Sequence, residues 1–444
     1  MTNVEATRVS NDWQGGVQTG TGHLRWSLSS FINYLMMTSI GRYGLAVMAP
    51  ALVAAVQLLL QLIVLHQVSA NEFGLYAFLM IIVQLGYGVS NALVCTPFAV
   101  LLHHSDDGSF DPKSFFSISL AYASLFGLIC LGIGKLFEPD NWIFVFALYG
   151  SIAMFRWFGR AYAYSNFKQF RAAGSDLIYA ISLFVCICVL YFVDHFDLMY
   201  LSGALLLSTA LGLLAIGKEF LKRQFLTSPV ASLTSYNGVW REQSRWALLG
   251  VVSTEATSNA HSYLVTAFAG PAAFAPLAAA AIFMKPVALA ITSLTQLERP
   301  AMSRALANGE YVKANVVRQK FLVALISIWV VVTALTFILL WLKPEIIAHQ
   351  GYSLLDLRLA AAFLAAIALI QVWQSPNSVF LQAAKEFRML STFSVKACLF
   401  SLPLVAIAIL AFGPVASLFG ILIGQTVMAI QISRQAKTWR LKYE

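Results

Sequence analysis

The segment Phe321–Leu342, FLVALISIWVVVTALTFILLWL, contains no charged residue and is long enough to cross a bilayer as one helix. A hydrocarbon layer of about 30 Å needs roughly 20 apolar residues at about 1.5 Å per residue. Similar apolar segments recur along the chain, at 43–65, 73–101, 115–134, 142–160, 177–193, 198–217, 246–268, 271–297, 358–375, 391–412 and 415–433. The sequence therefore predicts an all-α polytopic membrane protein with about twelve transmembrane helices.

The composition and charge exclude several other classes of protein. The chain is 59% hydrophobic and 11% charged, whereas a soluble domain carries roughly 25% charged residues. Its net charge of +9 is spread over many segments instead of one basic face. We therefore expect contact with anionic membrane lipids and no nucleic-acid partner. All five cysteines fall inside predicted spans, which predicts neither disulfides nor a metal site.

The basic residues predict the orientation of the chain. If the spans alternate from a cytoplasmic N-terminus, 25 of the 29 Lys and Arg lie on the cytoplasmic side. Only Lys135, Lys343 and Arg358 lie outside, and Lys285 lies within a span. Short cytoplasmic loops are enriched in Lys and Arg in this way. The pattern predicts a multi-pass membrane protein with both termini in the cytoplasm.

The same topology predicts the domain organisation. Residues 24–39 are predicted either as an interfacial helix or as part of the first span. The predicted domains are a cytoplasmic N-terminal segment at 1–40, an N-lobe at 41–217, a cytoplasmic linker at 218–245, a C-lobe at 246–433 and a basic cytoplasmic tail at 434–444.

An internal repeat supports the division into two lobes. Segment 73–113 aligns with 274–313, so that Phe73 falls on Phe274 and Ala77 on Ala278. The tetrapeptide KQFR at 168–171 recurs as KEFR at 385–388, each before the fifth helix of its half. Because six is an even number of spans, both halves start on the same side and the repeat is parallel. Two six-helix lobes around a central cavity are typical of transporters.

Two charged residues, Lys285 and Glu255, lie deep inside predicted spans. Charges at such a depth are costly, and they mark substrate or ion pathways in membrane proteins. We predict Lys285 as the cation of a substrate path. Glu255 is predicted either to couple transport to an ion or to form an ion pair with Lys285, which would then be structural.

Other polar residues are weaker candidates for the same path. Arg42 and Arg156 are predicted to line its cytoplasmic mouth, with snorkelling to the interface as the alternative. Asn259 and His261 lie near Glu255 on one predicted helix. Several amides in spans are candidate sugar ligands, or alternatively hydrogen bonds between helices: Gln57, Gln61, Gln84, Asn91, Gln371 and Gln374.

Three short motifs resemble a known family. They are ANEFGLY at 70–76, the two K-x-F-R turns, and FGPVASLFG at 412–420 followed by Gly424-Gln425. They are similar to Wzx-like polysaccharide flippases of the multidrug/oligosaccharidyl-lipid/polysaccharide exporter superfamily, over about residues 41–433. The resemblance implies transport of undecaprenyl-diphosphate-linked oligosaccharides by alternating access, for exopolysaccharide or O-antigen assembly. The same resemblance implies that the protein lies in the bacterial inner (plasma) membrane. It also implies a polysaccharide polymerase and a chain-length regulator as partners.

The sequence departs from the family and leaves alternatives open. Ala275 stands in the second half where Gly74 stands in the first, and the two extra C-terminal helices of lipid II flippases are missing. A multidrug efflux antiporter of the same superfamily would need an acidic cavity. A membrane-embedded polysaccharide polymerase or glycosyltransferase would need a larger external loop than 343–357. A scaffold of a biosynthetic complex would not need an intramembrane lysine. We expect no covalent chemistry and no cofactor.

Overall fold

The computed structural model describes residues 39–104, 112–138, 140–166, 168–193, 196–226, 236–342, 353–384 and 386–443. The chain divides into two compact units, Met1–Gly44 and Leu45–Glu444. All the contacts and cavities described below lie in the second unit. The predicted alternatives for residues 24–39 lie outside the described residues.

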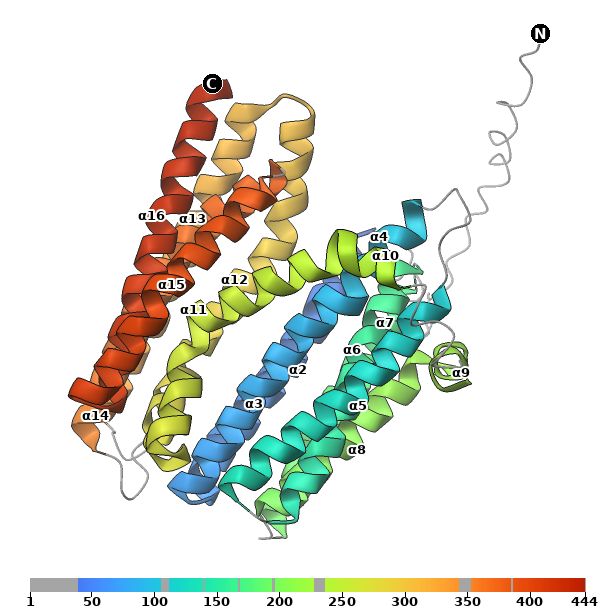
Figure 1. Cartoon of the computed structure of the whole chain (residues 1–444), viewed down its shortest axis with the longest axis vertical. Helices are drawn as coiled ribbons and strands as arrows, with labels where there is room; N and C mark the ends of the chain where they lie inside the picture. Colours follow the sequence, from blue (N-terminus) through green and yellow to red (C-terminus); the bar gives the residue numbers. More distant parts are fainter. Residues whose placement is uncertain are drawn as a thin grey trace, which may run out of the picture. The chain divides into compact units, whose positions relative to one another are not determined.

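All regular elements of the described residues are helices (Figure 1). The long helices of the first half are α2 (Ser39–Gln67), α3 (Ala70–Ser90), α5 (Pro112–Phe137), α6 (Trp142–Ser165), α7 (Gln169–Phe192) and α8 (Leu198–Ile216). Those of the second half are α11 (Arg245–Ala269), α12 (Pro271–Ala307), α13 (Tyr311–Leu342), α14 (Leu354–Ala383), α15 (Phe387–Phe412) and α16 (Ser417–Tyr443). Short elements are η1 (Asn91–Cys95), α4 (Thr96–His104), α9 (Lys218–Leu226), α10 (Asn237–Val239), η2 (Trp240–Ser244) and η4 (Pro414–Ala416).

The twelve long helices coincide with the twelve predicted spans, so the predicted fold class is confirmed. Eleven helices of the described residues are long and apolar enough to cross a membrane. The twelfth, α11, has sufficient length, but its centre carries the polar run Thr254–His261. Helix α13 exposes many apolar side chains, including Val323 and Val331, while one face with Phe321 and Leu325 is buried. Such a helix suits a position against lipid.

Helices α12 and α16 continue past the apolar segments that the sequence predicts as spans. Helix α12 extends to Ala307, ten residues beyond the end of the predicted span at 297. The basic segment at 434–444 continues α16, which is helical to Tyr443. Hydropathy marks only the part of a helix that matches hydrocarbon. A polar helix end therefore escapes prediction from apolar runs.

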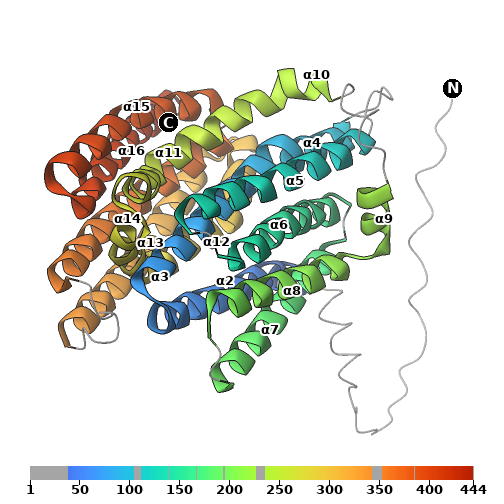
Figure 2. The ribbon, with the colours of Figure 1, turned by 60° about the horizontal axis from the view of Figure 1, so that its bottom comes forward.

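The two halves repeat the same helix packing (Figure 2). In the first half α5 packs on α6, α6 on α8 and α7 on α8. Counted among the six long helices of that half, these pairs are the third with the fourth, the fourth with the sixth and the fifth with the sixth. In the second half α13 packs on α14, α14 on α16 and α15 on α16. These are the same three pairs, as expected for the predicted parallel repeat.

The halves meet where α3 packs against α11 and α12. Helix α3 begins with a capping box, in which Ser69 and Glu72 each accept a hydrogen bond from the backbone N–H of the other. A Cβ atom added to Gly74 would lie 1.9 Å from the backbone oxygen of Pro271 and 3.4 Å from Cβ of Ala275. Gly74 therefore permits the contact between the halves. Because Gly74 and Ala275 are equivalent in the repeat, the axis that relates the halves passes near this contact.

Candidate functional site

A cavity of about 300 Å³ lies between the two halves. Its walls come from α2 and α3 of the first half and from α11, α12, α14 and α16 of the second. Phe73 and Met80 supply apolar wall from α3, and Leu277 and Ile282 supply it from α12. The volume falls at the lower end of the roughly 300–1,000 Å³ that is usual for small-molecule sites. This is the predicted central cavity.

Lys285 lines this cavity and is the only Lys, Arg, Asp or Glu among the described residues that do so. It is half-buried in the middle of α12, and its Nζ donates a hydrogen bond to Oε1 of Gln61 on α2. No carboxylate of the described residues forms an ion pair with it. An ammonium group has three donors and no acceptor. At least part of its hydrogen-bonding capacity and all of its charge are therefore available to a ligand.

Glu255 does not form the ion pair with Lys285 that was one of the predicted alternatives. Its Oε1 instead accepts hydrogen bonds from Nδ2 of Asn259 and from the hydroxyl of Tyr263, both at 2.8 Å. All three residues lie on α11, one and two turns apart. The carboxylate is thus bound by neutral donors of its own helix.

The structure brings most of the predicted polar candidates to the cavity. Gln84, Asn259, His261 and Gln371 line it, together with Lys285. His261 is buried, with its Nε2 atom 3.2 Å from the hydroxyl of Ser262. Its Nδ1 atom has no hydrogen-bond partner among the described residues. These side chains reach the cavity from three helices, α3, α11 and α14, which a single sequence pattern does not show.

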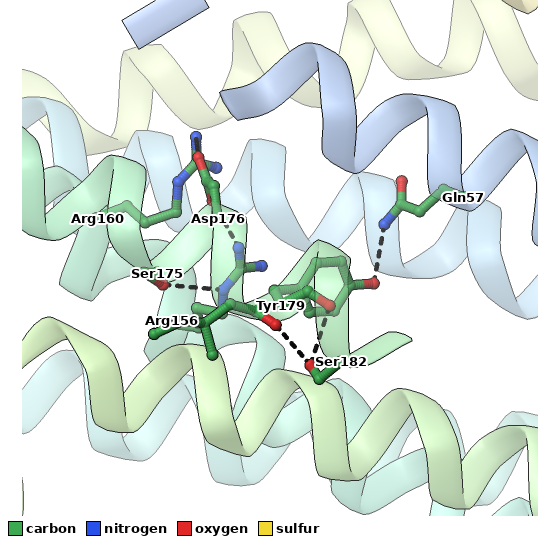
Figure 3. Close-up of polar contacts among 8 residues, drawn as sticks. Gln57, Arg156, Arg160, Ser175, Asp176, Tyr179 and Ser182 are labelled. Atoms are coloured by element: carbon green, nitrogen blue, oxygen red, sulfur yellow. Dashed lines mark hydrogen bonds and ion pairs between the residues drawn. The ribbon is translucent and has the colours of Figure 1, made fainter. Parts of the chain in front are cut away.

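Gln57 and Arg156 do not lie at this cavity but in a buried cluster of the first half (Figure 3). Gln57 donates a hydrogen bond to the hydroxyl of Tyr179 at 3.2 Å. The guanidinium carbon of Arg156 lies 4.3 Å from the centroid of the Tyr179 ring. Arg156 also donates to Ser175 at 3.2 Å, which anchors α6 to α7. Arg156 is thus buried within the first half and does not line the Lys285 cavity.

Asp176 holds this cluster together and was missed by the sequence analysis. Its Oδ1 lies 2.5 Å from Nη2 of Arg156, and its Oδ2 lies 2.9 Å from Nη2 of Arg160. The Asp176 side chain is 1% exposed, so two cations share one almost fully buried anion. The signal in the sequence was the spacing of Arg156 and Arg160, which puts both on one helix face. Asp176 sits one residue before the predicted span 177–193 and was not considered.

Arg42 lies in α2, but its side chain is outside the part of the chain that the structure describes. The second K-x-F-R turn, at 385–388, is only partly described, because Lys385 is outside the described residues. In the first turn, Nζ of Lys168 lies 2.7 Å from Oε2 of Glu219 on α9. This ion pair ties the start of α7 to the segment that joins the halves.

Comparison with known proteins identifies the fold. No protein-family model and no curated protein matches the sequence. Solved structures do match. Among them is a multidrug resistance MATE family transporter of the MOP superfamily in an inward-facing conformation. Its TM-score is 0.64 and its sequence identity is 14%, over 93% of this chain and 98% of that chain. A MATE transporter of Vibrio cholerae matches with a TM-score of 0.58 and 15% identity, over 94% and 98%. A MOP superfamily transporter from Pyrococcus furiosus matches with a TM-score of 0.57 and 13% identity, over 93% and 98%. The chain therefore has the fold of MOP superfamily transporters.

Proposed function

We propose that this protein is a transporter that moves undecaprenyl-diphosphate-linked oligosaccharides across the bacterial inner membrane, from the cytoplasmic to the outer leaflet. The products would enter exopolysaccharide or O-antigen assembly. The observation that carries the proposal is the cationic Lys285 without a carboxylate partner in the cavity between the halves. A diphosphate carries about two negative charges and needs a cation when it leaves water.

The surroundings of Lys285 favour an anion over the cations that drug antiporters export. No Asp or Glu among the described residues lines the cavity, so a cationic ligand would meet only the positive charge of Lys285. The Pyrococcus furiosus relative in fold is described as having a binding pocket of reverse polarity that suggests a different function. With Lys285 as its charged residue, the cavity of this chain has the polarity for a negatively charged ligand.

The proposed transport cycle uses the contact between the halves. They touch at Gly74 and Pro271, at the end of α3 that the charge pattern assigns to the outer side. Separation there, with closure at the opposite end, would move the cavity from the inner to the outer side. Glu255, held by neutral donors, is the proposed site of ion coupling. Translocation needs no covalent step, so we propose no enzymatic activity, and a polymerase and a chain-length regulator as downstream partners.

Substitution of Lys285 in cells that depend on this protein for polysaccharide export tests the proposal. Lys285→Ala should stop export and accumulate lipid-linked repeat units in the inner leaflet at normal protein abundance. Lys285→Arg should retain part of the export, because the charge is kept. Lys320→Ala, which removes an exposed lysine of α13, is the matched control and should export normally. Normal export by Lys285→Ala would refute the proposal.

A further inference from the structure

A second cavity, of about 430 Å³, adjoins the Lys285 cavity within the second half. The two share Ser258, Ala288 and Gln371 in their walls, so they are neighbours. The walls of the second cavity come from α11, α12, α14 and α16. The two cavities are therefore adjacent, as the sites for two bonded groups of one ligand would have to be.

The hydrogen-bonding side chains of the second cavity are all neutral. Among the described residues that line it, none is acidic, basic or aromatic. Its polar lining consists of amides and hydroxyls, chiefly Thr254, Ser258, Thr292, Gln371, Gln374 and Gln425. A charged group would find no counter-charge here, and a cation would find no aromatic ring to stack on. This chemistry differs from that of the adjoining cavity with its lysine.

Two successive hydrogen bonds link three polar side chains of this lining. Nε2 of Gln374 donates to Oε1 of Gln425 at 3.4 Å, and Nε2 of Gln425 donates to the hydroxyl of Ser258 at 3.1 Å. Oε1 of Gln374 is buried and accepts no hydrogen bond from any described residue. The Ser258 hydroxyl donates to none of them. This chain of hydrogen bonds thus ends in an acceptor and a donor that make no further hydrogen bond among the described residues.

A buried acceptor without a partner is costly, and in native structures such a group points to water or a ligand. Interhelical packing alone would explain the two hydrogen bonds between α14, α16 and α11. It does not explain why the Oε1 atom of Gln374, a residue that lines the cavity, has no hydrogen-bond partner among the described residues. A hydroxyl group both donates and accepts, so it can satisfy either end of this chain.

We infer that the second cavity binds uncharged, hydroxyl-rich sugar of the lipid-linked substrate, next to the diphosphate at Lys285. The inference rests on the proposed function and narrows its substrate class. In such a lipid the first sugar is bonded directly to the diphosphate, so the two must occupy neighbouring sites. The neutral lining selects a neutral sugar in this position and disfavours a uronic acid, whose carboxylate would lie unpaired among amides and hydroxyls.

Binding to the purified full-length protein with three probes tests this inference. The probes are undecaprenyl diphosphate, the same lipid carrying one N-acetylhexosamine, and the same lipid carrying one hexuronic acid. The wild-type protein should bind the N-acetylhexosamine lipid about tenfold more tightly than the bare lipid, as expected for one or two added hydrogen bonds. The hexuronic acid lipid should show no such gain.

Two variants assign the gain to the second cavity. Gln374→Met and Thr292→Val each keep the approximate side-chain volume and remove polar atoms from the parts of the lining that α14 and α12 supply. Each should lose most of the tenfold gain while retaining the affinity for the bare lipid, which also shows that the variant is folded. Gln382→Met is the matched control, because Gln382 lies on the same helix α14 and lines neither cavity.

The possible failures are distinguishable. Equal binding of the bare and N-acetylhexosamine lipids would overturn the sugar site while leaving diphosphate binding intact. An equal gain for the hexuronic acid lipid would overturn the selectivity for neutral sugar. Failure of all three lipids to bind the wild-type protein would overturn the proposed function and this inference with it.

Discussion

Removal of the Asp176 carboxylate should destabilise the first half of the protein strongly. Asp176 is the shared partner of Arg156 at 2.5 Å and Arg160 at 2.9 Å. The two arginine side chains are 9% and 17% exposed, so water cannot replace the lost anion. Breaking a buried ion pair by removing one partner costs about 3–5 kcal/mol, because a buried charge is left unpaired. Asp176→Asn leaves two cations in this situation and should reach this range.

Thermal unfolding of the detergent-purified protein measures the effect. Scaled to the entropy of unfolding of a chain of this size, a loss of this magnitude lowers the midpoint by roughly 3–6 °C. Glu310→Gln is the matched control, because Glu310 pairs with Lys313 at 2.9 Å on an exposed surface. Exposed pairs contribute about 0–1 kcal/mol, so its midpoint should shift by no more than about 1 °C.

A triple variant separates lost charge balance from lost packing. Asp176→Leu combined with Arg156→Met and Arg160→Met removes all three charges and should recover much of the lost stability. An unchanged midpoint for Asp176→Asn, or a triple variant less stable than the single one, would refute the reasoning.

Three more predictions follow from the contacts described above. Gly74→Ala should push α3 away from Pro271 and lengthen the distance between spin labels at positions 71 and 272 in a cysteine-free background. Gly203→Ala is the control and should leave this distance unchanged, because Gly203 has open space around it. An unchanged distance in Gly74→Ala would contradict the prediction. Hydrogen bonds from Lys168 and then Tyr162 hold the pKa of the Glu219 carboxyl below its usual value. The wild-type protein should therefore be more stable than Glu219→Gln above pH 4.5, and this advantage should disappear as the pH falls through the lowered pKa. A stability advantage of the wild type that grows on acidification would contradict this prediction. Glu255→Gln and Lys285→Met should have additive effects on unfolding, with a coupling energy below about 0.5 kcal/mol, and a large coupling would show that the two charges form a pair after all.

The sequence predicts the twelve helices because each must match the bilayer, and this requirement is visible as an apolar run. Helix α11 was predicted despite its polar centre, since the flanking apolar residues are sufficient in number. The ends of α12 and α16 could not be predicted in the same way. Beyond the hydrocarbon, hydropathy no longer constrains a helix, and its length depends on packing against neighbours.

The site could be predicted only in part. Lys285 was found because a charge within a span stands out in the sequence. Its partner was not, because the rotation of each helix about its axis decides whether Lys285 meets Gln61 or Glu255. The same limit applies to Gln57 and Gln61, which lie four residues apart on α2 and contact Tyr179 and Lys285 respectively. Tertiary packing, and not local sequence pattern, decides which of these polar groups lie at the Lys285 cavity and which lie in the buried cluster around Asp176.

Flipping by the reconstituted protein tests the central claim most directly. Proteoliposomes containing wild-type protein should translocate a fluorescent undecaprenyl-diphosphate-linked oligosaccharide, and those containing Lys285→Met should not, although both proteins are folded. Under the same conditions neither protein should transport a cationic dye. Equal flipping by the wild type and Lys285→Met, or dye transport without lipid flipping by the wild type, would contradict the account.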